Sequence, residues 1–76
     1  MKLNKNTVGV EAVNKALEIL NCFTEKREEL NLTQLSKITG NYKSTTLRLS
    51  RSLENYGYLE KEPNGKYKLG PARDIA

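Results

Sequence analysis

Apolar residues recur at three- and four-residue steps over the first third of the chain. This period predicts a helix from residue 10 onward, with an apolar face made by Val13, Ala16, Leu17 and Leu20. Residues 1–9 are polar and lack the period, so we expect a flexible N-terminal arm there. The charged run over residues 24–31 ends the helix.

Two further helical segments follow, separated by Gly40. Thr33 is the predicted N-cap of the second helix, because its hydroxyl can accept from an unpaired backbone N–H. Leu35 and Ile38 then form the buried face of that helix. Gly40 ends it, since glycine enters the left-handed C-cap conformation without a Cβ penalty. Asn41 is the expected N-cap of the helix that comes next.

The third helix is predicted over about residues 42–56. With Leu49 as the inward direction and steps of about 100° per residue, the inner side consists of Tyr42, Thr45, Thr46, Leu53 and Tyr56. The outer face consists of Lys43, Ser44, Leu47, Arg51 and Glu54, with Arg48 and Asn55 at its flanks. The outer face of the first three turns is therefore expected to be basic and hydroxylated.

A β-hairpin is predicted from residues 58–62 and 66–69. A two-residue Asn64-Gly65 turn would place Leu59 and Leu69 on opposite faces. A three-residue turn, type I with a bulge at Gly65, uses the preference of Pro63 for the first central position of such a turn. We predict this second turn, which pairs Leu59 with Leu69 and Lys61 with Tyr67.

Composition narrows the classes of function. A chain of 76 residues forms one small domain, and its one cysteine and lack of histidine leave no plausible metal cluster and no nucleophile–base pair. We therefore expect neither an enzyme nor a bound cofactor. No run is long and apolar enough for a signal peptide or a membrane span, and a lone cysteine suits the cytoplasm.

Positive charge is concentrated in the middle of the chain. The formal net charge is +4, and residues 31–56 hold four Lys/Arg against one Glu, which gives +3 of that total. Such a segment favours a polyanion as partner. Helix, tight turn, basic helix and hairpin follow each other in the order of a winged helix-turn-helix, a mainly α fold of three helices and a two-stranded wing. This fold places its third helix in the major groove of double-stranded DNA.

Several segments resemble the DNA-binding domain of IclR-type transcriptional regulators. They are residues 12–20 (AVNKALEIL), 43–49 (KSTTLRL), 57–58 (GY) and 65–71 (GKYKLGP). The resemblance covers roughly residues 10–71, and its spacing is more diagnostic than any single segment. Three positions depart from the family pattern: Tyr42 replaces a proline, Leu47 a polar residue and Ser50 an apolar one.

The resemblance implies a repressor or activator that binds operator DNA as a homodimer. It also implies a C-terminal domain, absent from this sequence, that senses a small-molecule effector. Residues 10–70 would then be the winged helix-turn-helix domain, and residues 71–76 the start of a linker to that second domain.

The candidate DNA contacts are polar or basic side chains, with one leucine, on the second helix, third helix and hairpin. They are Thr33, Gln34, Lys43, Ser44, Thr45, Leu47, Arg48, Arg51, Lys66 and Lys68. The start of a helix favours a phosphate, and Arg48 can reach a guanine or a phosphate with its fork of donors. Lys66 and Lys68 are candidates for flanking backbone.

Each of these roles has an ordinary structural alternative. Ser44 could serve only as a hydroxyl at a helix end, and Arg48 could pair with a glutamate of the first helix. Leu47 could contact a thymine methyl or be a simple exposed leucine. The two hairpin lysines could merely keep an edge strand soluble. A winged-helix protein adaptor is the leading rival function, and RNA binding is less favoured because the tyrosines are placed as core.

Overall fold

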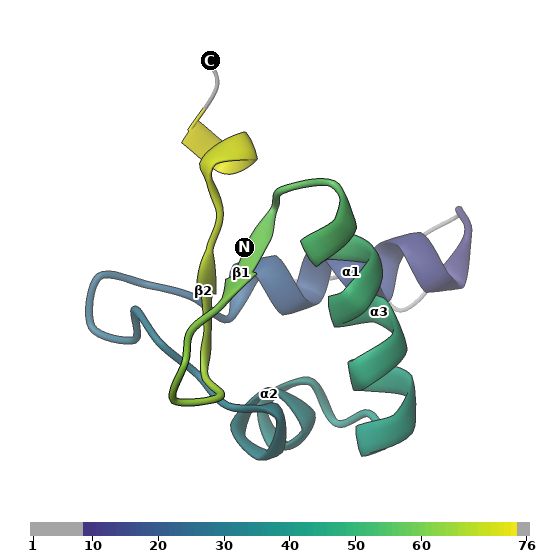
Figure 1. Ribbon diagram of the computed structural model, residues 1–76. Coiled ribbons are helices and arrows are strands. Elements are labelled where there is room, and N and C mark those ends of the chain that lie inside the picture. Colours follow the sequence, from purple (N-terminus) through teal and green to yellow (C-terminus); the bar gives the residue numbers. More distant parts are fainter. Residues whose placement is uncertain (1–8, 75–76) are drawn as a thin grey trace.

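The structure is a computed structural model that describes residues 9–74. Its elements are α1 (Glu11–Asn21), α2 (Leu32–Thr39), α3 (Lys43–Asn55), β1 (Leu59–Lys61), β2 (Tyr67–Leu69) and the short 3-10 helix η1 (Pro71–Asp74). The three helices pack against one another, with the hairpin at one side of the bundle (Figure 1). This is the predicted winged helix-turn-helix. The arm predicted over residues 1–9 lies outside the described residues except for Gly9, and so do the last two residues of the predicted linker.

Helix α1 is rotated relative to the prediction. Ile19 and Leu20 are its buried residues, and Ala16 packs against the core from a partly buried position. Leu17, predicted as core, is 51% exposed. The prediction for Leu17 is therefore wrong: α2 and α3 pack against α1, and Ile19 is buried there instead of Leu17.

Helix α2 begins two residues earlier than predicted, and Thr33 is not its N-cap. Asn31 takes that position: its side-chain oxygen accepts from the Gln34 N–H at 2.8 Å, and the Gln34 side-chain oxygen accepts from the Asn31 N–H at 2.8 Å. This reciprocal capping box satisfies two backbone donors at once, which a lone threonine cap could not do. Leu35 is fully buried as predicted, but Ile38 is 44% exposed and is not part of the core.

The turn between α2 and α3 depends on Gly40. Gly40 has φ 76° and ψ 15°, the left-handed conformation predicted for it, and its N–H donates to Ser36 O at 2.9 Å. The Ser36 hydroxyl donates to Asn41 O at 2.6 Å, which holds the next residue in place. Asn41 is not the N-cap of α3 as predicted. That position belongs to Tyr42, which makes no side-chain cap hydrogen bond.

The hairpin has the predicted register. Leu59 lies opposite Leu69, Glu60 opposite Lys68 and Lys61 opposite Tyr67 in an antiparallel pair. Gly65 has φ 87°, as a bulge glycine in a three-residue loop requires. A feature that the sequence did not indicate is an isolated bridge between Leu30 and Tyr67, which adds a third, minimal strand beside β2.

The core lies between the helices and the hairpin. Its buried members are Ile19, Leu20, Cys22, Phe23, Leu30, Leu35, Leu53, Leu59 and Tyr67, with Leu49 and Leu69 partly buried against them. Tyr42 and Tyr56, predicted on the inner side of α3, are exposed because they lie just beyond the two ends of that helix. No helix in the described part of the chain has the length and apolar character needed to cross a bilayer.

Candidate nucleic-acid interface

The exposed face of α3 is the centre of the candidate interface. The buried residues of this helix are Thr46, Ser50 and Leu53, whereas Leu49 is only half-buried. At 3.6 residues per turn, these positions rotate the inward direction by roughly 60–70° from the predicted one. Ser44, Arg48, Arg51 and Asn55 consequently lie near the middle of the exposed face.

This rotation corrects the predicted faces of α3 in two places. Leu47 and Glu54 were expected to point outward, but both are half-buried at the edge of the helix. Arg48 and Asn55 were expected at the flanks, but both are exposed. Leu47 therefore lies at the edge of the exposed face of α3, and Arg48 lies near its middle. Thr45 is half-buried beside α1.

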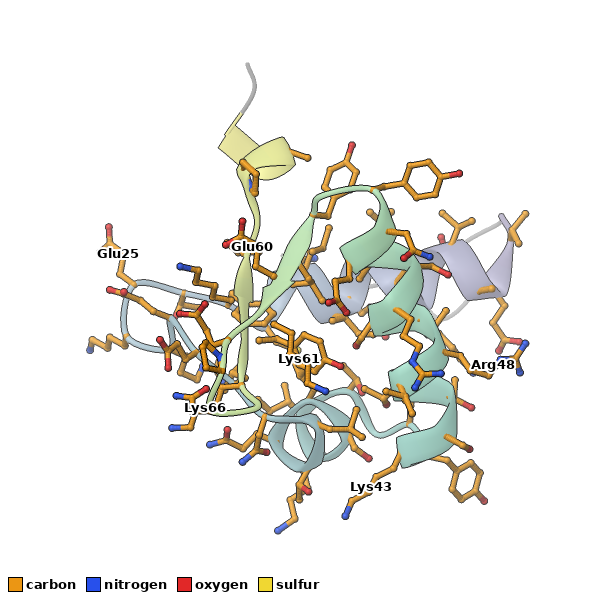
Figure 2. All side chains as sticks on the ribbon, in the orientation of Figure 1. Glu25, Lys43, Arg48, Glu60, Lys61 and Lys66 are labelled. Carbon is orange, nitrogen blue, oxygen red and sulfur yellow. The ribbon has the colours of Figure 1, made fainter. Side chains whose placement is uncertain are left out.

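Arg48 lies beside a hollow between α1 and α3. The hollow has a volume of about 360 Å³ and is lined by Glu11, Ala12, Lys15, Thr45, Arg48, Leu49 and Ser52. Within the described residues Arg48 makes no ion pair, and Glu11 instead pairs with Lys15 at 3.8 Å. The alternative of a salt bridge to a first-helix glutamate is therefore not observed. Figure 2 shows Arg48 on the side of α3 away from the hairpin.

The N-terminal end of α3 is open to solvent. Lys43 and Ser44 are exposed in its first turn, and Lys43 extends from the foot of the helix in Figure 2. The first backbone N–H groups of a helix lack partners within it, and the cap residue Tyr42 supplies no side-chain acceptor to them. This end of α3 therefore presents backbone donors and a lysine together, a combination that suits a phosphate.

The start of α2 contributes differently from the prediction. Thr33 is exposed and free of the capping role. Gln34 is exposed too, but its side-chain oxygen is engaged with the Asn31 N–H. The amide NH₂ of Gln34 forms no hydrogen bond within the described residues and is available as a donor.

The two hairpin candidates differ in their surroundings. Lys66 is half-buried at the turn end of β2. Lys68 is held between two carboxylates, with its Nζ 3.5 Å from Glu62 Oε1 and 3.7 Å from Glu60 Oε1. The structure thus brings Ser44, Arg48 and Arg51 together on α3 and sets Lys68 apart in an acidic environment.

Two pKa shifts describe the interior next to this surface. Burial raises the pKa of the Tyr67 hydroxyl, the Glu54 carboxylate raises it further, and the Arg51 guanidinium opposes them. Burial also raises the pKa of the Cys22 thiol, whose Sγ donates to Glu18 O at 3.3 Å. Both groups stay neutral near pH 7, so neither adds charge to the interface. Within the described residues no cluster of histidine, cysteine or carboxylates is suited to a metal ion.

Comparison with known proteins identifies the fold and the family. The model of the IclR helix-turn-helix domain matches residues 12–63. The chain belongs to this family. The resemblance to the DNA-binding domain of IclR-type regulators is thereby confirmed.

Individual relatives agree with this assignment. The HTH-type transcriptional regulator XynR of Escherichia coli is 44% identical over 62 residues, which are 80% of this chain and 25% of XynR. The regulator KipR of Bacillus subtilis is 37% identical over 88% of this chain and 25% of its own length. The chain therefore spans about a quarter of the length of these relatives.

Solved structures of IclR-family proteins have the same fold. The IclR family transcriptional regulator from Brucella abortus superposes with a TM-score of 0.84 at 31% identity, over 91% of this chain and 27% of that protein. The IclR transcriptional regulator from Alicyclobacillus acidocaldarius superposes with a TM-score of 0.82 at 29% identity, over 87% and 27%. These structures confirm the predicted winged helix-turn-helix.

Sequence reasoning missed the structural roles of three residues: Leu30, Asn31 and Lys61. The Asn31–Gln34 spacing is a capping-box signature that could have been recognised. No sequence pattern predicts the burial of Leu30, because it is a single apolar residue after a charged run. Lys61 was predicted to pair with Tyr67 and was given no further role, although its side chain is exposed and its Nζ lies 5.9 Å from the centroid of the Tyr67 ring.

Proposed function

We propose that the domain holds operator DNA with the exposed face of α3 in the major groove, the start of α2 on one backbone strand and the hairpin on the flanking backbone. One observation carries this proposal: no acidic residue precedes Glu54 in α3, and Ser44, Arg48 and Arg51 share its exposed face. Arginine at such a position can donate two hydrogen bonds to guanine. Serine and lysine at the helix start suit phosphates.

We further propose that two copies act together on a two-fold related operator, as dimeric helix-turn-helix proteins do. A small-molecule effector would act only through a C-terminal domain that these 76 residues do not contain. The role requires no catalysis and no cofactor, and it places the protein in the cytoplasm with the DNA. The relatives are transcriptional regulators, which gives the alternative of a protein adaptor no support.

Salt dependence tests the proposal. Fluorescence anisotropy with a labelled mixed-sequence duplex, measured over a series of KCl concentrations, gives the slope of log affinity against log salt. About four to six phosphate contacts predict a slope of roughly −4 to −5. A slope near zero, or no binding at low salt, would contradict DNA binding and favour the adaptor.

A further inference from the structure

The two faces of the hairpin differ in charge. Register places Leu59, Lys61, Tyr67 and Leu69 on the face toward the core, and strand alternation sends Glu60 and Lys68 to the other face. We call the face with Glu60 and Lys68 the outer face. Of the four residues on the face toward the core, Lys61 alone is exposed, since it lies at the end of β1.

The outer face is acidic around Lys68. One ammonium group lies within 4 Å of two carboxylates, those of Glu60 and Glu62, so the three side chains sum to −1. Glu28 and Glu29 line the same hollow as Lys68. These pairs are partly exposed and stabilise the fold little. A phosphate approaching this face would nevertheless meet four carboxylates around one lysine.

Lys61 has the opposite environment. Its Nζ lies 5.9 Å from the centroid of the Tyr67 ring, a cation–π contact that holds the side chain over the aromatic face. Among the described residues it forms no ion pair. The ammonium of Lys61 is therefore not neutralised by a neighbouring carboxylate in this part of the chain, and the Tyr67 ring favours its position.

Lys61 also lies on the side of the hairpin next to α3. Strand β1 packs against α3, and the Tyr67 hydroxyl lies near that helix, where burial and Glu54 raise its pKa and Arg51 lowers it. Figure 2 shows Lys61 between the hairpin and α3, and Glu60 on another side of the hairpin. Lys61 and Arg51 are thus exposed residues on either side of the buried Tyr67, where the hairpin meets α3.

We propose that Lys61 is the phosphate contact of the wing and that Lys68 is not a DNA contact. This inference rests on the proposed DNA binding and specifies which hairpin charge serves it. A DNA strand flanking the groove that holds α3 would pass Lys61, whose ammonium is already positioned by Tyr67. Lys68 would remain in its pair of carboxylates on the outer face, turned away from the duplex.

A matched pair of substitutions tests the proposal. Lys61→Gln and Lys68→Gln change the net charge of the whole chain by the same amount, so any difference in affinity comes from position. Binding of the 76-residue chain to a labelled mixed-sequence duplex is measured by anisotropy over a KCl series. We expect Lys61→Gln to weaken binding about 5-fold at low salt and to reduce the salt slope by about one unit. Lys68→Gln should change affinity less than about 2-fold and leave the slope unchanged.

Two additions make the result specific. Lys61→Arg retains the charge and should bind like the wild type, and thermal melting of every variant shows that each is folded. Equal losses from the two glutamine variants, or a larger loss from Lys68→Gln, would overturn the assignment of Lys61 while leaving DNA binding intact. Failure of the wild-type chain to bind would instead refute the proposed function, and the inference with it.

Discussion

Leu30 and Tyr67 exchange two backbone hydrogen bonds, from the Leu30 N–H to Tyr67 O at 3.0 Å and from the Tyr67 N–H to Leu30 O at 2.8 Å. Both side chains are buried. Since the next residue, Asn31, is the N-cap of α2, this pair connects the wing directly to the start of the helix-turn-helix. The relative position of the hairpin and α2, both proposed to contact DNA, depends on this pair.

Leu30→Ala is therefore expected to destabilise the domain by about 2–5 kcal/mol, through lost burial and the cavity left behind. The measurement is urea unfolding followed by circular dichroism. Leu17→Ala is the matched control, because Leu17 is half exposed and should lose less than about 1 kcal/mol. Similar losses from the two variants would mean that Leu30 does not belong to the core.

Ser50 gives a prediction of the opposite sign. Its side chain is fully buried in α3, and its Oγ has no hydrogen-bond partner within the described residues. Removing an unsatisfied buried hydroxyl avoids its desolvation cost. We expect Ser50→Ala to raise the free energy of unfolding by about 1–2 kcal/mol.

Ser52→Ala serves as the control for Ser50→Ala. Ser52 is exposed on the same helix, so its replacement gains only the difference in helix propensity, roughly 0.5 kcal/mol. Chemical denaturation of both variants separates the two contributions. If the free energy of unfolding rose no more for Ser50→Ala than for Ser52→Ala, the buried Ser50 hydroxyl would not destabilise the fold.

Gly70 lies where the chain leaves the wing, and there is no room for a larger residue. A Cβ there would collide with the carbonyl oxygen of Gly57, and the Gly70 N–H donates to Tyr58 O at 2.9 Å. Gly70→Ala should cost about 3 kcal/mol, because backbone atoms must move.

Gly65→Ala is the comparison for Gly70→Ala. A Cβ on Gly65 meets no atom within 4 Å, so the strain comes only from its φ of 87° and should cost about 1–2 kcal/mol. Melting temperatures of the two variants test the order. A smaller loss at Gly70 than at Gly65 would contradict close contact between the two chain segments.

Arg48 should read a base. It is exposed on α3 and makes no ion pair in the described part of the chain. We expect Arg48→Ala to lose about 1–3 kcal/mol on an operator selected from random duplexes, and to lose preference at one base position. The measurement is affinity for a panel of single-base operator variants.

Lys61→Gln is the control on the same panel, and it should weaken all duplexes by a similar factor. A uniform loss for Arg48→Ala would make Arg48 a phosphate contact. Ser44, Thr45 and Leu47 would then be the remaining candidates for base contacts.

Local chemistry in the sequence was sufficient for the order of elements and for two of the turns. Gly40 ends α2 because few other residues adopt its backbone angles, and Pro63 with Gly65 determines a hairpin register that strand alternation carries to Leu59 and Leu69. The concentration of lysine and arginine over residues 31–56 likewise predicted a polyanion as the partner. These features depend on residues close together in the chain.

The tertiary structure decided which face of each helix is buried and which charges remain free. Thr46 and Ser50 are fully buried while Leu49 only borders the core, because α1, α2 and β1 all pack against α3 and together decide which of its sides is covered. Leu30 enters the core only because β2, far along the chain, pairs with it. Lys61 and Lys68 have the same side chain and differ only in the neighbours that folding provides, an aromatic ring for one and two carboxylates for the other.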